Sequence, residues 1–183
     1  MHTAAHARTF LILLLAVVGS TSCGYHLSGT GSIIPPGTET IAVPSFINAT
    51  KEPYVDVEVT KAVINEFVAD GRLHVVDVEG ADLVLRGKTV KYEAIPVSYT
   101  ASTYVQQYRV RLVVDAVLED LRSKKVLWQE KGIEAVFISD YAVLYNAAGR
   151  ADITAAKTLK EQAITRASQD IALTLRSRVL EGF

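Results

Sequence analysis

The chain has 183 residues, of which 19 are Lys or Arg and 20 are Asp or Glu, so its formal net charge is −1. A near-neutral chain of this length suits one domain with a sizeable core. It is a poor match for nucleic acid, because phosphate binding favours a strongly basic surface. A single cysteine also excludes a disulfide within the chain.

A short apolar run, Phe10–Val18, precedes the single cysteine, Cys23, with small residues between them. The run is shorter than the roughly 20 residues of a membrane-spanning helix and has the length of a signal-peptide core. A cysteine at the cleavage point resembles a bacterial lipoprotein signal. We therefore predict a signal peptide over residues 1–22 and lipid on Cys23, as S-diacylglycerol and an N-linked acyl group such as palmitate. Two or more acyl chains anchor a protein stably to a membrane. The residue after the cysteine is Gly24 and not Asp, which resembles lipoproteins that are sorted to the outer membrane.

Residues 23–39 contain Gly, Ser, Thr and Pro and predict an irregular, lipidated tether before one folded domain over residues 40–183. The domain begins with a short β-prone run, residues 40–46, in which Pro44 favours a strand end or edge. Apolar residues then recur every four positions from Val55 to Phe67. This period predicts a helix over residues 54–70 that ends at Gly71.

Four further strands and a second helix follow. Residues 108–120 alternate most clearly, with one face apolar throughout, which indicates a strand covered on one side. A turn at residues 120–125 joins it to the next strand as an antiparallel hairpin, with an irregularity expected at Gly132. The predicted elements are a short strand at 73–78, a longer one at 83–95, strands at 108–120 and 126–137, a loop at 139–150 and a helix at 153–180.

Two helices with one apolar stripe each, and strands with one apolar face, are buried most simply in two layers. We therefore predict an α+β two-layer sandwich, with both helices on one face of a roughly four-stranded mixed or antiparallel sheet. The opposite face would turn Lys91, Arg109 and Arg111 toward water or a partner.

Several segments, in this order and spacing, resemble the LptE family of lipopolysaccharide-assembly lipoproteins. They are Cys23–Leu27, Ile41–Asn48, Asn65–Phe67, Ala81–Gly87, Tyr108–Val110, Val126–Trp128 and Gly182–Phe183. The resemblance implies two helices on a four-stranded sheet. It also implies an outer-membrane protein on the periplasmic side that plugs the LptD β-barrel and helps it place lipopolysaccharide in the outer leaflet.

The segment Ala94–Val114 contains no acidic residue and is rich in Tyr, Ser, Thr and Gln. A polar, uncharged and aromatic surface suits contact with sugars and with the polar lumen of a barrel. The candidate partner contacts are Tyr99, Tyr104, Gln106 and Tyr108. The alternative is an ordinary exposed hairpin loop.

Basic side chains on an exposed strand face could bind the phosphates of lipopolysaccharide. The candidates are Lys88, Lys91, Arg109 and Arg111, with Lys124 and Lys125 at the predicted turn as a second group. The alternative is a solvated strand face without a ligand.

The sequence does not favour an enzyme. Beyond the predicted signal peptide the histidines are His26 and His74, and no spacing of His, Cys or acidic residues indicates a metal site, a nucleophile or a cofactor other than the lipid. The competing hypothesis is another envelope lipoprotein, because residues 41–50 also resemble activators of penicillin-binding proteins (peptidoglycan synthases) and curli-secretion pore lipoproteins. Those proteins would continue with helix–strand alternation after residue 80. A purely structural envelope lipoprotein is the third possibility.

Overall fold

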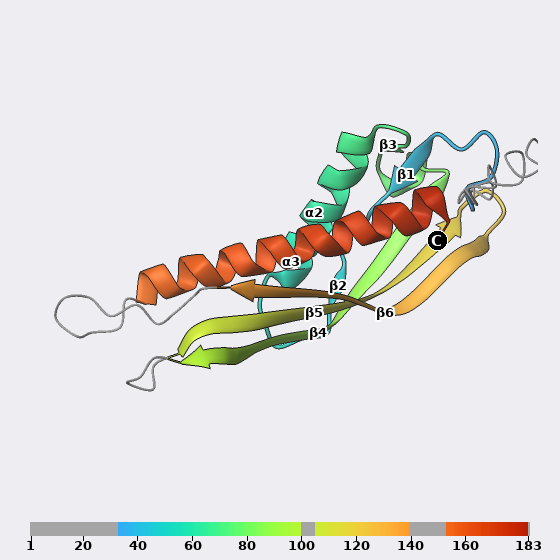
Figure 1. Ribbon diagram of the computed structural model, residues 1–183. Helices are drawn as coiled ribbons and strands as arrows, with labels where there is room; N and C mark the ends of the chain where they lie inside the picture. Colours follow the sequence, from blue (N-terminus) through green and yellow to red (C-terminus); the bar gives the residue numbers. More distant parts are fainter. Residues whose placement is uncertain (1–32, 100–104, 140–152, 183) are drawn as a thin grey trace, which may run out of the picture. The chain divides into compact units, whose positions relative to one another are not determined.

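A computed structural model describes residues 33–99, 105–139 and 153–182, which belong to the second of two units, Met1–Thr30 and Gly31–Phe183. Two helices and six strands make up the described part, together with a short 3₁₀ helix (Figure 1). The strands are β1 (Thr40–Ala42), β2 (Ile47–Asn48), β3 (His74–Val75), β4 (Leu83–Tyr99), β5 (Val105–Asp120) and β6 (Lys125–Ser139). The helices are α2 (Val55–Asp70), η1 (Val78–Gly80) and α3 (Ile153–Glu181).

The six strands form one mixed sheet in the order β3-β1-β4-β5-β6, with β2 beside β4. Strands β4, β5 and β6 form an antiparallel meander, whereas β1 and β2 run parallel to β4. The expected count of four strands is therefore too low, although the α+β class is confirmed. The strand predicted at 40–46 ends as β1 at Ala42, two residues before Pro44, which cannot donate to a sheet ladder, and β2 begins only after the predicted span. The strand predicted at 73–78 shrinks to β3 and is followed by η1.

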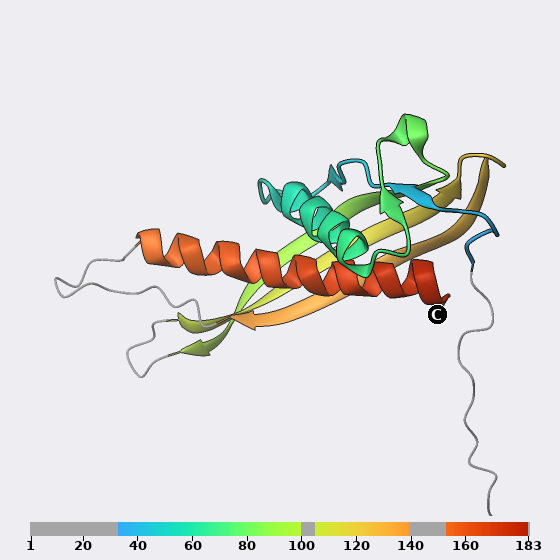
Figure 2. The ribbon, with the colours of Figure 1, turned by 90° about the horizontal axis from the view of Figure 1, so that it is seen from above.

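Both helices cover one face of this sheet, and α3 packs across β5 and β6 with α2 beside it (Figure 2). The predicted four-residue periods are confirmed, because they mark the buried sides of the helices. The buried members of these two stripes are Val55, Val59, Val63, Phe67, Ala163, Ala167, Ile171, Leu175 and Val179. The buried face of β5 packs against these helix residues through Val110, Leu112, Val114, Ala116 and Leu118.

Two glycines shape the fold, one through its backbone conformation and the other through its lack of a side chain. Gly71 ends α2 in the left-handed region (φ 74°) and donates its N–H to the Phe67 carbonyl at 3.1 Å, as the sequence predicted. Gly87 lies in β4 opposite Ala116, and a Cβ there would collide with the Phe46 ring. The Phe46 ring is therefore buried in the space that a side chain at position 87 would otherwise occupy.

Candidate functional site

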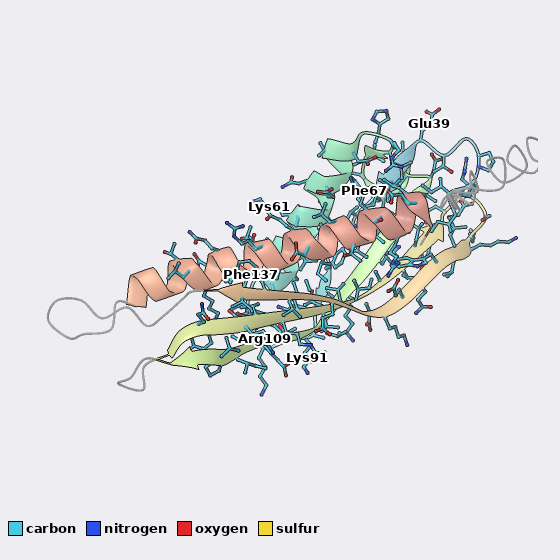
Figure 3. The ribbon with its side chains drawn as sticks, in the orientation of Figure 1. Glu39, Lys61, Phe67, Lys91, Arg109 and Phe137 are labelled. Carbon is cyan, nitrogen blue, oxygen red and sulfur yellow. The ribbon has the colours of Figure 1, made fainter. Side chains whose placement is uncertain are left out.

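The face of β4, β5 and β6 that points away from the helices, called the outer face below, carries four of the six candidate cations. Its members on β5 are Arg109, Arg111, Val113, Asp115, Val117 and Glu119, which alternate with the buried core positions. Figure 3 shows Lys91 and Arg109 on this side of the sheet and Phe137 on the helix side. The predicted apolar and charged faces of residues 108–120 are therefore confirmed.

A chain of ion pairs crosses the middle of the outer face. Arg111 donates from Nε and Nη2 to the two carboxylate oxygens of Glu134, at 2.7 and 2.6 Å. Its Nη1 lies 3.8 Å from Glu93, whose other oxygen lies 3.0 Å from Lys91 Nζ. The Arg111 hydrogen bonds hold the pKa of Glu134 below its usual value, and Glu134 raises the pKa of Arg111. Two of the six predicted cations, Lys91 and Arg111, are thus already matched by carboxylates.

Arg109 has a different environment. Its cross-strand neighbours are Ile95 on β4 and Ile138 on β6, and both are about half exposed. Val97 and Val136 on the same face are also exposed. Arg109 forms no ion pair with any residue that the structure describes. The outer face therefore combines an unmatched guanidinium with a group of exposed aliphatic side chains.

A shallow hollow of about 200 Å³ lies farther along the outer face. Lys88 lines it together with Arg86 and Lys131, which the sequence analysis did not single out. Asp115, opposite Lys88 in the register, instead accepts a hydrogen bond from the Gly132 N–H at 2.9 Å. The alternation of β4 could have identified Arg86, and that of β6 could have identified Lys131 once the irregularity expected at Gly132 was applied as a shift in register.

The structure does not bring the other candidates to this place. Lys124 and Lys125 lie at the turn between β5 and β6, at the opposite end of the strands from Arg109. Tyr108 faces the helices and packs against the core cluster. The side chains of Tyr99, Tyr104 and Gln106 lie outside the described residues, as does Cys23. Of the loop predicted at 139–150 only Ser139 is described, and it ends β6.

A polar cluster that the sequence analysis missed fixes the end of the sheet near the β5–β6 turn. Asp82 Oδ2 accepts hydrogen bonds from the N–H groups of Glu39 and Thr40 at 2.9 and 3.1 Å and from Thr40 Oγ1 at 3.0 Å. Arg122 lies 3.7 Å from both Asp82 and Asp120 and donates to Gly37 O and Thr38 Oγ1. The hydrogen bond from the Glu39 N–H is the largest cause that lowers the pKa of Asp82. These contacts are structural, since each carboxylate is used by its neighbours.

A larger hollow, of about 780 Å³, lies between the start of α2 and the first half of α3. Its lining has equal numbers of Lys and Glu side chains. Lys160 pairs with Glu52 at 2.8 Å, and the Thr165 hydroxyl donates to Glu58 at 3.1 Å. Across the described ranges, no three His, Cys, Asp or Glu side chains lie close enough to hold a metal ion. No helix in those ranges is long and apolar enough to cross a bilayer.

The model of the LptE family, whose description is lipopolysaccharide-assembly, matches residues 38–179. The chain belongs to the LptE family. It is therefore a lipopolysaccharide-assembly lipoprotein of the bacterial envelope, from a family of non-enzymatic proteins. The three consecutive long strands of this LptE-family chain after residue 80 also differ from the alternation expected for the competing lipoprotein classes.

Solved structures share the fold of this LptE-family protein at low sequence identity. A candidate lipoprotein from Caulobacter crescentus CB15 is 11% identical, with a TM-score of 0.51 over 74% of this chain and 87% of its own. The hypothetical protein CT253 from Chlamydia trachomatis is 10% identical, with a TM-score of 0.51 over 78% of this chain and 98% of its own. No curated protein matches the sequence significantly. At these identities the structures indicate a common fold.

Proposed function

We propose that this LptE-family protein is an outer-membrane lipoprotein, acylated on Cys23 and held on the periplasmic side, that fills the lumen of an LptD-like β-barrel. In that position it would help the barrel to pass lipopolysaccharide to the outer leaflet. The match of the family model over residues 38–179 is the observation that carries this proposal. A wide barrel has a polar lumen that leaks unless something occupies it.

The outer face supports a direct contact with lipopolysaccharide. Lipopolysaccharide presents phosphates beside acyl chains, and Arg109 stands between the exposed side chains of Ile95 and Ile138. A guanidinium can bind a phosphate with two parallel hydrogen bonds, and the flanking aliphatic groups suit a lipid. Lys88 and Lys131 extend the basic surface along the same face, whereas Arg86 beside them is paired with Glu119 at 3.5 Å.

The ion-pair chain changes the ranking of the candidate cations. Arg111 and Lys91 would have to leave Glu134 and Glu93 before they could bind a phosphate. Arg109 and Lys88 need no such exchange with the described residues. We therefore place Arg109 first among the residues that contact lipopolysaccharide and assign Arg111 to orienting the strands.

The decisive experiment is purification of the full-length, affinity-tagged protein from its native outer membrane in mild detergent. We expect one large β-barrel to co-purify in a one-to-one ratio, measured by native mass spectrometry. Recovery of a peptidoglycan synthase, of a homo-oligomeric pore or of no stoichiometric partner would contradict the proposal. A matched purification of an unrelated tagged lipoprotein controls for barrels that co-purify through detergent micelles.

A further inference from the structure

The outer edge of β6 is open over part of its length. Within the described chain β6 pairs with β5 on one side and with no strand on the other. Such an edge exposes a row of unpaired N–H and C=O groups, and natural proteins protect it with lysines, prolines, bulges or shortness. The question is whether β6 is protected in this way.

The two halves of β6 differ in this respect. The first half, Lys125–Gly132, has two breaks in register, includes Lys125 and Lys131, and is tied to α3 by the Arg178–Glu130 ion pair. The second half, Ile133–Ile138, pairs with β5 without a break and contains no lysine or proline. Its one charged residue, Glu134, is held by Arg111. Only the first half carries the usual protection.

The free edge of β4 at the same end of the sheet is protected. Its ladder with β5 shifts register between Thr89 and Lys91 and again on either side of Ser98. Pro96 also removes one backbone donor from this strand. Among the described strands, Ile133–Ile138 is therefore the long, regular edge that has no lysine, proline or bulge to oppose the addition of another strand.

The side chains along this edge define what could lie beside it. Val136 and Ile138 point to the outer face and are 47% and 53% exposed. Phe137 points to the helix side, where the Arg166 guanidinium lies 5.7 Å from its ring centroid. Arg166 is exposed and forms no ion pair with a described residue. An added strand would meet two apolar residues on one face and a cation on the other.

We propose that Ile133–Ile138 accepts one added β-strand from the barrel protein, an inference that rests on the proposed function. The added segment would carry apolar side chains beside Val136 and Ile138 and an acidic side chain between them, beside Phe137 and Arg166. Main-chain hydrogen bonds would supply affinity and these side chains specificity. Wall strands of a closed barrel are already paired on both edges, so the donor is a loop or terminal segment in extended conformation.

A second copy of the chain fits this edge less well. Antiparallel self-pairing centred on Val136 would place the two Phe137 side chains diagonally, about 7–8 Å apart on the same face. The two Arg166 guanidinium groups above them would then repel each other across the junction. A segment that brings a carboxylate to Arg166 removes this charge conflict.

A photo-cross-linking residue tests the proposal in the full-length chain expressed with its barrel. Placed at Val136, the probe is expected to cross-link to one extended loop or terminal segment of the barrel. Ile95 is the matched position, because it is also 47% exposed on the outer face but belongs to β4. Its yield for that segment should be lower by about tenfold, because strand addition places the donor beside β6 and not beside β4.

Substitution gives a second readout. With the probe at Ile138, Val136→Lys should reduce the cross-link by about tenfold, since lysine at an edge opposes strand addition. Val126→Lys, at a 57% exposed position in the protected first half of β6, should leave it unchanged, and circular dichroism should show both variants folded. Equal cross-linking from Ile95, a cross-link to a second copy, or none to a co-purified barrel would overturn the edge inference alone. Failure of the barrel to co-purify would overturn the proposed function and this inference with it.

Discussion

Two buried threonines differ in whether their hydroxyl groups are hydrogen-bonded, and this difference should affect the stability of the core. Thr60 Oγ1 accepts a hydrogen bond from the Phe46 N–H at 2.9 Å and donates to the Asp56 carbonyl at 2.6 Å. Thr89 is fully buried, and its Oγ1 has no partner among the described residues. A buried polar group without a partner keeps its desolvation cost, whereas a bonded one offsets it.

The same substitution should therefore act with opposite signs at the two positions. Thr89→Val is expected to raise the free energy of unfolding by about 1 kcal/mol, because it removes an unpaired hydroxyl at nearly constant volume. Thr60→Val should lower it by about 1–3 kcal/mol, since the buried Phe46 N–H loses its acceptor. Urea unfolding followed by circular dichroism measures both values. A destabilised Thr89→Val variant would mean that its hydroxyl is hydrogen-bonded in solution.

At the scale of single elements, the cluster around Asp82 makes the stability of the sheet end depend on pH. The backbone N–H of Glu39 lowers the pKa of Asp82, and the Ser123 hydroxyl lowers that of Asp120. A folded-state pKa below the unfolded value gives stability that is present above the unfolded pKa and is lost as the pH falls through the folded one. The urea midpoint should therefore fall between about pH 5 and pH 2.

Asp82→Asn should be less stable than the parent at pH 7 and should lose less stability on acidification. The remaining slope comes from the other lowered carboxyls, which are Asp70, Asp120 and Glu134. Unfolding midpoints of both proteins across this pH range provide the measurement. Identical slopes would show that Asp82 does not contribute to the acid response.

The outer face of β5 gives a prediction for ligand binding. Arg109→Glu should weaken binding of purified lipopolysaccharide by about tenfold or more, as expected for the loss of a charge-assisted hydrogen bond. Lys124→Glu is the matched control, because Lys124 is exposed, lacks an ion pair with the described residues and lies at the far end of β5. Isothermal titration with both folded variants measures the effect. If both variants lost the same affinity, the effect would come from the change in net charge and not from a contact at Arg109.

The sequence predicted the long elements well because each carries its own periodicity. Helices α2 and α3 follow apolar four-residue spacing, and β5 follows strict alternation. The short strands β1, β2 and β3 could not be bounded, since two or three residues have no period and their pairing depends on distant strands. The ion pairs of Arg111 could not be predicted either. The contact with Glu93 depends on the β4–β5 register, which shifts between Thr89 and Lys91, and the contact with Glu134 depends on the β5–β6 register, which shifts between Val114 and Ala116.

At the scale of the whole molecule, attachment to the membrane is predicted to depend on Cys23. Cys23→Ala should abolish labelling with radioactive palmitate and move the protein from the membrane to the soluble fraction, because two or more acyl chains are what make such anchoring stable. Ser22→Ala keeps a small residue at the adjacent position and should retain both properties. Full labelling of Cys23→Ala would disprove the lipoprotein assignment.

The two groups of candidate cations define opposite ends of the domain. From Arg109 to the end of β5 the strand extends by roughly 35–40 Å, at about 3.4 Å per residue, before the turn that holds Lys124. One lipopolysaccharide headgroup could not engage both groups at once. We therefore propose the outer face near Arg109 as the contact with lipopolysaccharide and leave the second predicted group, Lys124 and Lys125, outside it.

The contacts of Arg122 also determine how the domain responds to mechanical force. A pull transmitted through the residues before Ile33 reaches Gly37 and Thr38, which Arg122 holds from the β5–β6 turn, before it reaches β1. The load is therefore shared between two segments that lie more than 80 residues apart in sequence. Beyond them, Asp82 holds Glu39 and Thr40 with several hydrogen bonds that must break together. Tension from a membrane anchor would be spread across the end of the sheet and would not peel β1 away one bond at a time.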